Sequence, residues 1–203
     1  MKVINCIQGS DEWLAARRGI PTASRFGNIV TPTGKAATGR ARYTYQLELL
    51  AERLTGRAAD HHVTAAMERG TMLEPAARAW YELASGEAVT QVGFVQSAGG
   101  RWGCSPDGIT TIGGCEIKCL SGVAHLEALL ARQVPADYVP QVQGCMFVTG
   151  RNHWDFVLYT DAAGIPSAWW RVERDAAFCD ALAECLPVFC DELDELERKV
   201  KTA

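Results

Sequence analysis

A chain of 203 residues, 48% hydrophobic and 22% charged, has the composition of one globular domain with a substantial core. No apolar run approaches the roughly 20 residues of a membrane-spanning helix, and the N-terminal residues lack a signal-peptide pattern. The eight cysteines contain no Cys-x-x-Cys pair, which disfavours a zinc ribbon. We therefore expect a cytoplasmic protein without a membrane partner, in which reduced cysteines pack as small hydrophobes.

Hydrophobic periodicity and turn residues predict an α/β or α+β domain, in which a central mixed sheet is flanked by helices. Within residues 42–55, for example, Tyr43, Leu47, Leu50 and Leu54 recur at helical spacing, and Gly56 ends the pattern. The expected helices cover residues 11–18, 22–30, 42–55, 71–85, 123–131, 138–148 and 176–200, the last with a kink at Pro187. The expected strands cover residues 88–96, 101–104, 115–120, 154–160 and 168–173, and loops cover 31–39 and 58–63.

Basic residues gather in the first part of the chain, although the net charge of −4 does not indicate nucleic-acid binding. Residues 1–60 hold nine Lys/Arg and five Asp/Glu, whereas residues 61–203 hold eleven and nineteen. The basic cluster consists of Arg17, Arg18, Arg25, Lys35, Arg40 and Arg42. These residues could line a phosphate track or could be solvated surface arginines. We divide the single domain 1–203 into a basic helical part (1–60), a core (61–175) and a C-terminal helix (176–200).

The most informative motif is Ser105-Pro106-Asp107-Gly108, followed by Glu116-Ile117-Lys118. Turn signals between strands 101–104 and 115–120 predict a short hairpin that places Asp107 beside the second strand. Because residues i and i+2 of a strand share a face, Glu116 and Lys118 should project together while Ile117 points into the core. An ordinary hairpin with a surface ion pair would show the same pattern.

This motif has the residue types of a magnesium-dependent phosphodiesterase. Two carboxylates and a backbone carbonyl are hard oxygen ligands, which suit Mg²⁺ or Mn²⁺ better than zinc. The lysine can position a water, help to deprotonate it, or neutralise charge in the transition state. The motif therefore predicts metal-assisted hydrolysis with Asp107, Glu116 and Lys118 as catalytic residues.

Three further polar residues are candidates for the same site. Glu74 is expected near the start of its helix, where it could be an ordinary first-turn acid or a third carboxylate for the metal. Gln141 and Gln143 flank a core valine, so that at most one of them is expected to reach a site.

Several motifs occur together in a recognisable order. They are Gln8-Gly9-Ser10-Asp11-Glu12-Trp13, Arg17-Arg18-Gly19-Ile20-Pro21-Thr22-Ala23-Ser24, Gly70-x3-Glu74, Cys104-Ser105-Pro106-Asp107-Gly108, Glu116-Ile117-Lys118-Cys119 and Tyr138-x2-Gln141-Val142-Gln143. Over about residues 5–175 the chain resembles the phage lambda exonuclease family, also called the YqaJ-type viral recombinases. Each motif alone is weak, but their order and spacing are highly specific.

The resemblance implies a restriction-endonuclease-like core and a Mg²⁺-dependent exonuclease, with Mn²⁺ as a possible substitute and two ions per site. Such an enzyme degrades one strand of linear double-stranded DNA from 5′ to 3′, releases 5′-mononucleotides and leaves 3′ single-stranded tails for recombination. The resemblance further implies a ring-shaped homotrimer around the DNA and cooperation with a single-strand annealing protein.

The matching motifs also imply roles for individual residues. Asp107, Glu116 and the Ile117 carbonyl would bind metal, Lys118 would act on the water, and Glu74 would bind metal directly or through water. A pocket for the DNA 5′-phosphate would contain Arg17, Ser24, Ser105 and Gln141. Met67 would be a wedge that separates the strands, and the other expected DNA contacts are Arg18, Arg25, Lys35, Arg40, Arg42 and Gln143.

The chain departs from the family pattern in places. The loop 31–40 looks shorter than in the family and lacks an arginine where the family often has one, Pro21 replaces the usual aliphatic residue before Thr22, and the acidic last thirty residues match poorly. Two alternatives stay open at this point. They are a structure- or site-specific endonuclease of the same superfamily and a catalytically silent module that binds DNA ends. The ungrouped cysteines disfavour an iron–sulfur nuclease.

Overall fold

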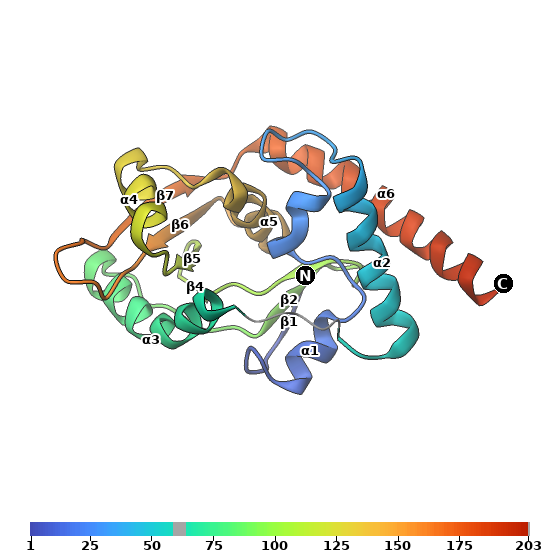
Figure 1. Ribbon diagram of the computed structural model, residues 1–203, viewed down its shortest axis with the longest axis horizontal. Coiled ribbons are helices and arrows are strands. Elements are labelled where there is room, and N and C mark those ends of the chain that lie inside the picture. The colour runs from blue at the N-terminus through green and yellow to red at the C-terminus, as the bar shows by residue number, and fades with distance from the viewer. Residues whose placement is uncertain (59–63, 203) are drawn as a thin grey trace.

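The computed structural model describes residues 1–58 and 64–202, so the loop expected at 58–63 lies, apart from Ala58, outside the described residues. The strands are β1 (Lys2–Ile4), β2 (Phe94–Gln96), β3 (Gly103–Cys104), β4 (Gly108–Ile109), β5 (Gly114–Lys118), β6 (His153–Leu158) and β7 (Ala168–Glu173). They form an antiparallel sheet, β1-β2-β3, and a mixed sheet, β4-β5-β6-β7, in which only β5 and β6 run parallel. Figure 1 shows helices around both sheets, which confirms the predicted mixed sheet flanked by helices.

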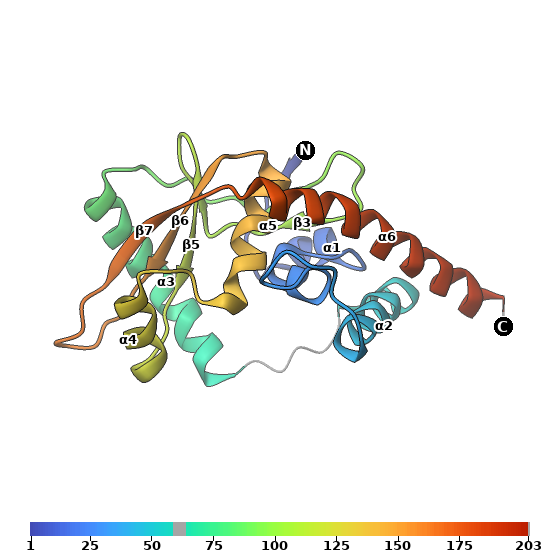
Figure 2. The same ribbon diagram turned by 90° about the horizontal axis from the view of Figure 1, so that it is seen from above.

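The helical segments account for most of the remaining chain. They are α1 (Asp11–Arg17), the 3-10 helix η1 (Ala23–Asn28), α2 (Arg40–Thr55), α3 (Ala65–Ser85), α4 (Gly122–Ala131), the 3-10 helix η2 (Ala136–Tyr138), α5 (Val139–Thr149) and α6 (Ala176–Lys201). The C-terminal end of α6 projects beyond the rest of the molecule (Figure 2). Among the described residues, no helix combines the length and apolar character needed to cross a membrane.

Different helices cover the two faces of the mixed sheet. On one face, Ala77 and Tyr81 of α3 pack with Val157 of β6. On the other face, Trp154 and Phe156 of the same strand join the larger core formed with α5 and α6. This division follows from the alternation of side chains along a strand. The layers therefore give each face of β5 a different environment.

The 3-10 helix η1 packs very closely on α5. A Cβ added at Gly144 would lie 2.5 Å from the ring of Phe26 and 3.2 Å from the Cβ of Ala23. Phe26 is fully buried at this contact. Glycine therefore allows the segment that carries Ser24 to approach the helix that carries Gln141.

Acidic residues of α6 neutralise arginines of the basic N-terminal part. Arg42 pairs with Glu192 at 2.5 Å, and Arg53 pairs with Asp194 at 2.7 Å and with Glu197 at 3.1 Å. Two of the nine basic residues in 1–60, Arg42 and Arg53, are thus neutralised by the C-terminal helix in the folded chain.

The hairpin around Asp107 differs from the prediction. β3 pairs with β2, and the antiparallel partner of β5 is β4, so the expected pairing of 101–104 with 115–120 is wrong. Gly108 is a strand residue in close packing, because a Cβ there would lie 2.1 Å from Val89. The turn lies later, where the Thr110 N–H donates to the Gly113 carbonyl at 3.1 Å. Asp107 nevertheless stays beside β5.

Two other boundaries also differ from the prediction. Helix α3 begins at Ala65, where the Thr64 hydroxyl accepts a hydrogen bond from the Met67 N–H at 3.2 Å. Glu74 therefore lies in about the third turn and is not a first-turn acid. The strand expected at 88–96 is reduced to β2 and an isolated bridge between Thr90 and Ile109.

Candidate active site

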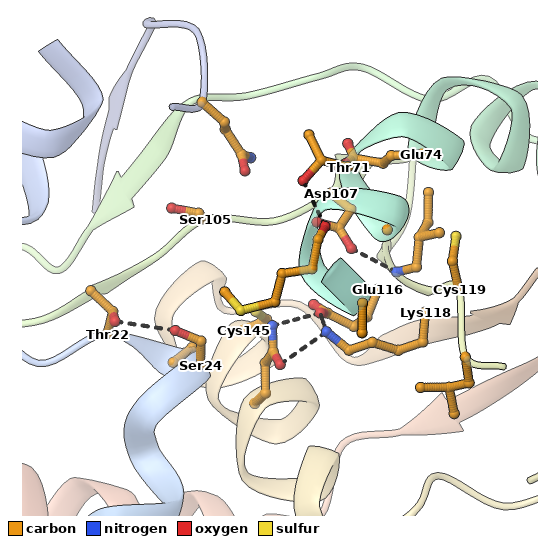
Figure 3. Close-up of a pocket in the computed structure, with 18 of the residues that line it drawn as sticks. Thr22, Ser24, Thr71, Glu74, Ser105, Asp107, Glu116, Lys118, Cys119 and Cys145 are labelled. Carbon is orange, nitrogen blue, oxygen red and sulfur yellow. Dashed lines mark hydrogen bonds and ion pairs between the residues drawn. The ribbon is translucent and has the colours of Figure 1, made fainter. Parts of the chain in front are cut away.

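The motif Glu116-Ile117-Lys118 lies on β5 and alternates between its two faces. Ile117 packs against the α3 side, as predicted. On the opposite face, the Lys118 amine donates to Glu116 Oε1 at 2.6 Å and to Gln141 Oε1 at 3.3 Å. The Gln141 amide donates to the same Glu116 oxygen at 2.5 Å. The structure thus joins three predicted site residues in one hydrogen-bonded group (Figure 3).

Glu116, Lys118 and Gln141 line a cavity of about 490 Å³, and two more carboxylates line it as well. Asp107 is held against β5, because its Oδ2 accepts a hydrogen bond from the Ile117 N–H at 2.7 Å. Glu74 reaches the cavity from α3. Three acids from three separate segments, Glu74, Asp107 and Glu116, therefore line one cavity with Lys118 (Figure 3).

Burial and mutual repulsion disturb the protonation of this group. Burial, and then the charge of Asp107, raises the pKa of Glu116 to about 8. Burial also raises the pKa of Asp107, and burial followed by the charge of Asp107 raises that of Glu74. Burial alone would lower the pKa of Lys118, but the Glu116 and Asp107 carboxylates outweigh it, so the pKa rises. The site therefore attracts a cation.

The chemistry of these residues fits a hard divalent metal ion. Oε2 of Glu116 is buried and has no hydrogen-bond partner in the described part of the chain. An unpaired carboxylate oxygen beside two other carboxylates is the kind of donor set that Mg²⁺ or Mn²⁺ prefers. The described residues contain no ready-made group of three His, Cys, Asp or Glu ligands, so a cation would have to draw the three acids together.

The same cavity also contains a cluster of polar side chains, of which Thr22, Ser24 and Ser105 lie away from Glu74 (Figure 3). The Trp13 indole donates to the Ser105 hydroxyl at 2.8 Å, and the Arg17 guanidinium lies 4.0 Å from the centre of the Trp13 ring. Arg17 also donates to the Thr22 hydroxyl at 3.3 Å, and that hydroxyl lies 3.3 Å from the hydroxyl of Ser24. Arg17 forms no ion pair with a carboxylate in residues 1–58 and 64–202. Its donors are available to an anionic ligand.

The other residues predicted to contact DNA are scattered, and only some of them line the cavity or the one beside it. Met67 is 54% exposed and lines both this cavity and an adjoining one of about 470 Å³. Arg18 and Arg25 line the adjoining cavity, although Arg25 already pairs with Glu48 at 2.9 Å. Three predicted contacts line neither cavity, namely Lys35, Arg40 and Arg42. Their contact with DNA stays a prediction.

Gln143 does not reach the cavity. Its side chain is buried, its amide nitrogen donates to the Glu173 carbonyl at 3.0 Å, and its amide oxygen accepts from the Asp175 N–H at 3.0 Å. Because both ends of the amide are used between β7 and α6, the predicted DNA contact at Gln143 is not supported. The expectation that at most one glutamine reaches the site is met by Gln141.

Two aromatic residues of the site, Trp13 and Tyr138, belong to the motifs quoted above but were assigned no role in the site from the sequence. Trp13 contacts both Arg17 and Ser105, and its spacing of four residues from Arg17 on a helix is the signal that could have found it. Tyr138 lies with its ring centre 4.8 Å from the Lys118 amine, a cation–π distance. Nothing in the local sequence indicates that contact, because the two residues come from different elements.

Comparisons with known proteins point to one group. The YqaJ-like viral recombinase domain matches residues 12–152. The fold is similar to an alkaline exonuclease (LHK-Exo) from Laribacter hongkongensis, which is 36% identical with a TM-score of 0.85, covering 95% of this chain and 97% of that chain. The structure of LHK-Exo in complex with dAMP gives the same values. The fold is also similar to that of a phage-related exonuclease from Haemophilus somnus 129PT. That protein is 16% identical, with a TM-score of 0.68 and coverage of 89% of this chain and 96% of that chain. No curated protein matches the chain significantly.

Proposed function

Because the chain belongs to the YqaJ-like viral recombinase family, we propose that it is a Mg²⁺-dependent exonuclease that degrades one strand of linear double-stranded DNA from 5′ to 3′. The family and the similarity to an alkaline exonuclease support a DNA exonuclease. Release of 5′-mononucleotides, which leaves 3′ single-stranded tails, is the finer part of the proposal. It is supported by the structure of LHK-Exo in complex with dAMP, which is a nucleoside monophosphate.

One observation carries the proposal: the acidic group and the cluster of polar side chains line the same cavity. In the proposed reaction, Arg17, Ser24, Ser105 and Gln141 bind the terminal 5′-phosphate. The scissile phosphodiester then lies by Asp107, Glu116 and Glu74. Met67 lies at the edge of both cavities, where a wedge could separate the terminal base pair. An end-bound strand thus reaches the catalytic residues in one fixed register.

Asp107, Glu116 and the Ile117 carbonyl would hold Mg²⁺, with Glu74 as a direct or water-mediated ligand and Mn²⁺ as a substitute. When bound, two such ions would supply Lewis-acid activation of the phosphate and of the attacking water. Lys118 contributes a donor that orients this water or neutralises charge on the phosphate. A cation bound to the carboxylates would offset the negative charge that raises the pKa of Lys118. A lower pKa would favour the action of Lys118 as a base.

Digestion of matched linear and circular duplex DNA, with Mg²⁺ or with EDTA, tests the proposal. We expect the linear DNA to be degraded only with Mg²⁺ and the circles to stay intact. Cutting of covalently closed circles would instead identify an endonuclease. Binding of linear DNA without any hydrolysis in Mg²⁺ or Mn²⁺ would identify a silent end-binding module.

We further propose that the protein works as a ring-shaped homotrimer with a single-strand annealing protein, in the cytoplasm. The family membership supports these points. A closed ring would hold DNA topologically, which suits a chain whose net charge of −4 gives little long-range attraction to phosphate.

A further inference from the structure

Glu74 forms an ion pair with Arg78, a residue that is not among those predicted for the site. Arg78 lies one turn further along α3, and its Nη2 donates to Glu74 Oε1 in an ion pair. The Arg78 side chain is only 12% exposed, so the guanidinium end of the pair is largely shielded from water, whereas Glu74 is 32% exposed. Glu74 Oε2 has no hydrogen-bond partner in the part of the chain that the structure describes. One carboxylate oxygen is therefore held, and the other is free for a ligand.

Arg78 is itself fixed by a second residue. In the amide orientation that its surroundings require, Gln91 Oε1 accepts hydrogen bonds from both Nη1 and Nη2 of Arg78 at 2.9 Å. Gln91 belongs to the segment between α3 and β2, so the guanidinium is anchored across two parts of the chain. Such anchoring restricts a long side chain that would otherwise sample many rotamers.

The position of Arg78 matters because Glu74 stands beside another acid. Burial, and then repulsion by the charge of Asp107, raises the pKa of the Glu74 carboxyl. Arg78 lines a separate cavity of about 600 Å³, which Glu74 also lines, whereas it does not line the one that contains Asp107. Arg78 therefore attracts Glu74 from outside the acidic group, and its charge also partly offsets the rise in the pKa of Asp107.

We propose that Arg78, fixed by Gln91, is a positioning residue that presents Glu74 to the metal site. The proposal rests on the proposed function, because it assigns Glu74 to the metal. The geometry resembles that of the outer hydrogen bonds that orient metal ligands in other proteins, where loss of the partner weakens metal binding or activity about 10- to 100-fold.

Mn²⁺ binding without DNA, measured by the electron paramagnetic resonance signal of free Mn²⁺, tests this role apart from activity. We expect Arg78→Met to weaken Mn²⁺ binding about tenfold. Arg78→Lys should weaken it less, because a cation remains. Arg101→Met is the matched control, since Arg101 pairs with Asp191 and Asp194 of α6, away from the cavity, and it should leave Mn²⁺ binding unchanged.

A double variant decides whether Arg78 acts through Glu74. If it does, Glu74→Gln/Arg78→Met should bind Mn²⁺ no more weakly than Glu74→Gln alone. Gln91→Leu should weaken binding in the same direction without removing a charge, and it replaces Arg78→Met if that variant fails to fold. Folded Arg78→Met and Gln91→Leu proteins with normal Mn²⁺ affinity would overturn the positioning role. Absence of Mn²⁺ binding and of nuclease activity in the unaltered protein would instead overturn the proposed function.

Discussion

Replacing Glu116 with Gln is expected to stabilise the metal-free protein at alkaline pH. Glu116 is 1% exposed, and burial together with Asp107 raises its pKa from 4.5 to about 8. The folded protein therefore favours the protonated form. The stability contributed by this preference is complete below the unfolded pKa near 4.5 and is lost as the pH rises through about 8. Glutamine has no proton to lose, so the variant escapes this loss.

The size of the effect follows from the same numbers. At about 1.4 kcal/mol per pKa unit, the rise from 4.5 to about 8 sets an upper limit of roughly 5 kcal/mol. The variant also loses the ion pair between Glu116 and Lys118, which reduces the expected net gain to about 1–3 kcal/mol. For a chain of this size, each kcal/mol corresponds to a change in Tm of about 2–4 °C.

Thermal unfolding in EDTA from about pH 5 to pH 9 measures this difference. The Tm of Glu116→Gln minus that of the unaltered protein should increase up to about pH 8 and then level off. The exposed Glu127→Gln is the control, with no such trend. Mg²⁺ should raise the Tm of the unaltered protein more at pH 9 than at pH 6, because the ion replaces the proton. Parallel Tm curves for Glu116→Gln and the unaltered protein would refute the reasoning.

Three other results are expected. Lys118→Ala and Asp107→Ala should each lower the hydrolysis rate at least about 100-fold with unchanged circular dichroism, and near-normal turnover of either would contradict its catalytic role. A 5′-phosphorylated linear duplex should be degraded faster than a 5′-hydroxyl duplex, and Arg17→Ala should remove most of that difference, whereas no preference in the unaltered enzyme would contradict the phosphate pocket. Size exclusion with light scattering should give three times the monomer mass, and a monomer at micromolar concentration would refute the ring.

The arrangement of the β5 residues in the site could be predicted because it depends on short-range rules. Alternation along one strand was enough to place Glu116 and Lys118 on a common face and Ile117 in the core. The order of the motifs then indicated which distant residues belong with them. The cavity contains Arg17 and Gln141 beside that strand, as expected from the resemblance.

Predictions that depended on tertiary contacts were less successful. The apolar stripe expected on residues 42–55 included Leu47 and Leu54, yet these are 38% and 41% exposed. The buried face includes Gln46, which can be buried because its amide donates to Glu192 of α6 at 2.7 Å. A polar residue paired with a distant helix leaves no signal in local periodicity.

The distribution of basic residues along the sequence was also an incomplete guide to which arginines are available to bind DNA. Arg42 was expected to face phosphate, but it is paired with Glu192, more than a hundred residues away in the sequence. Arg25 is likewise paired with Glu48. Net charge per segment counts such residues as free, whereas the fold decides which of them keep an unneutralised charge.

The close contact at Gly144 has a consequence for the shape of the proposed phosphate pocket. Ser24 lies on η1 and Gln141 lies on α5, so the packing of η1 on α5 sets the separation between two residues that are proposed to hold the DNA end. With Phe26 2.5 Å from the position of a Cβ at Gly144, even one methyl group would push these elements apart. In an exonuclease of the proposed kind, a glycine that need not touch the DNA would thus set how well the site fits a terminal phosphate.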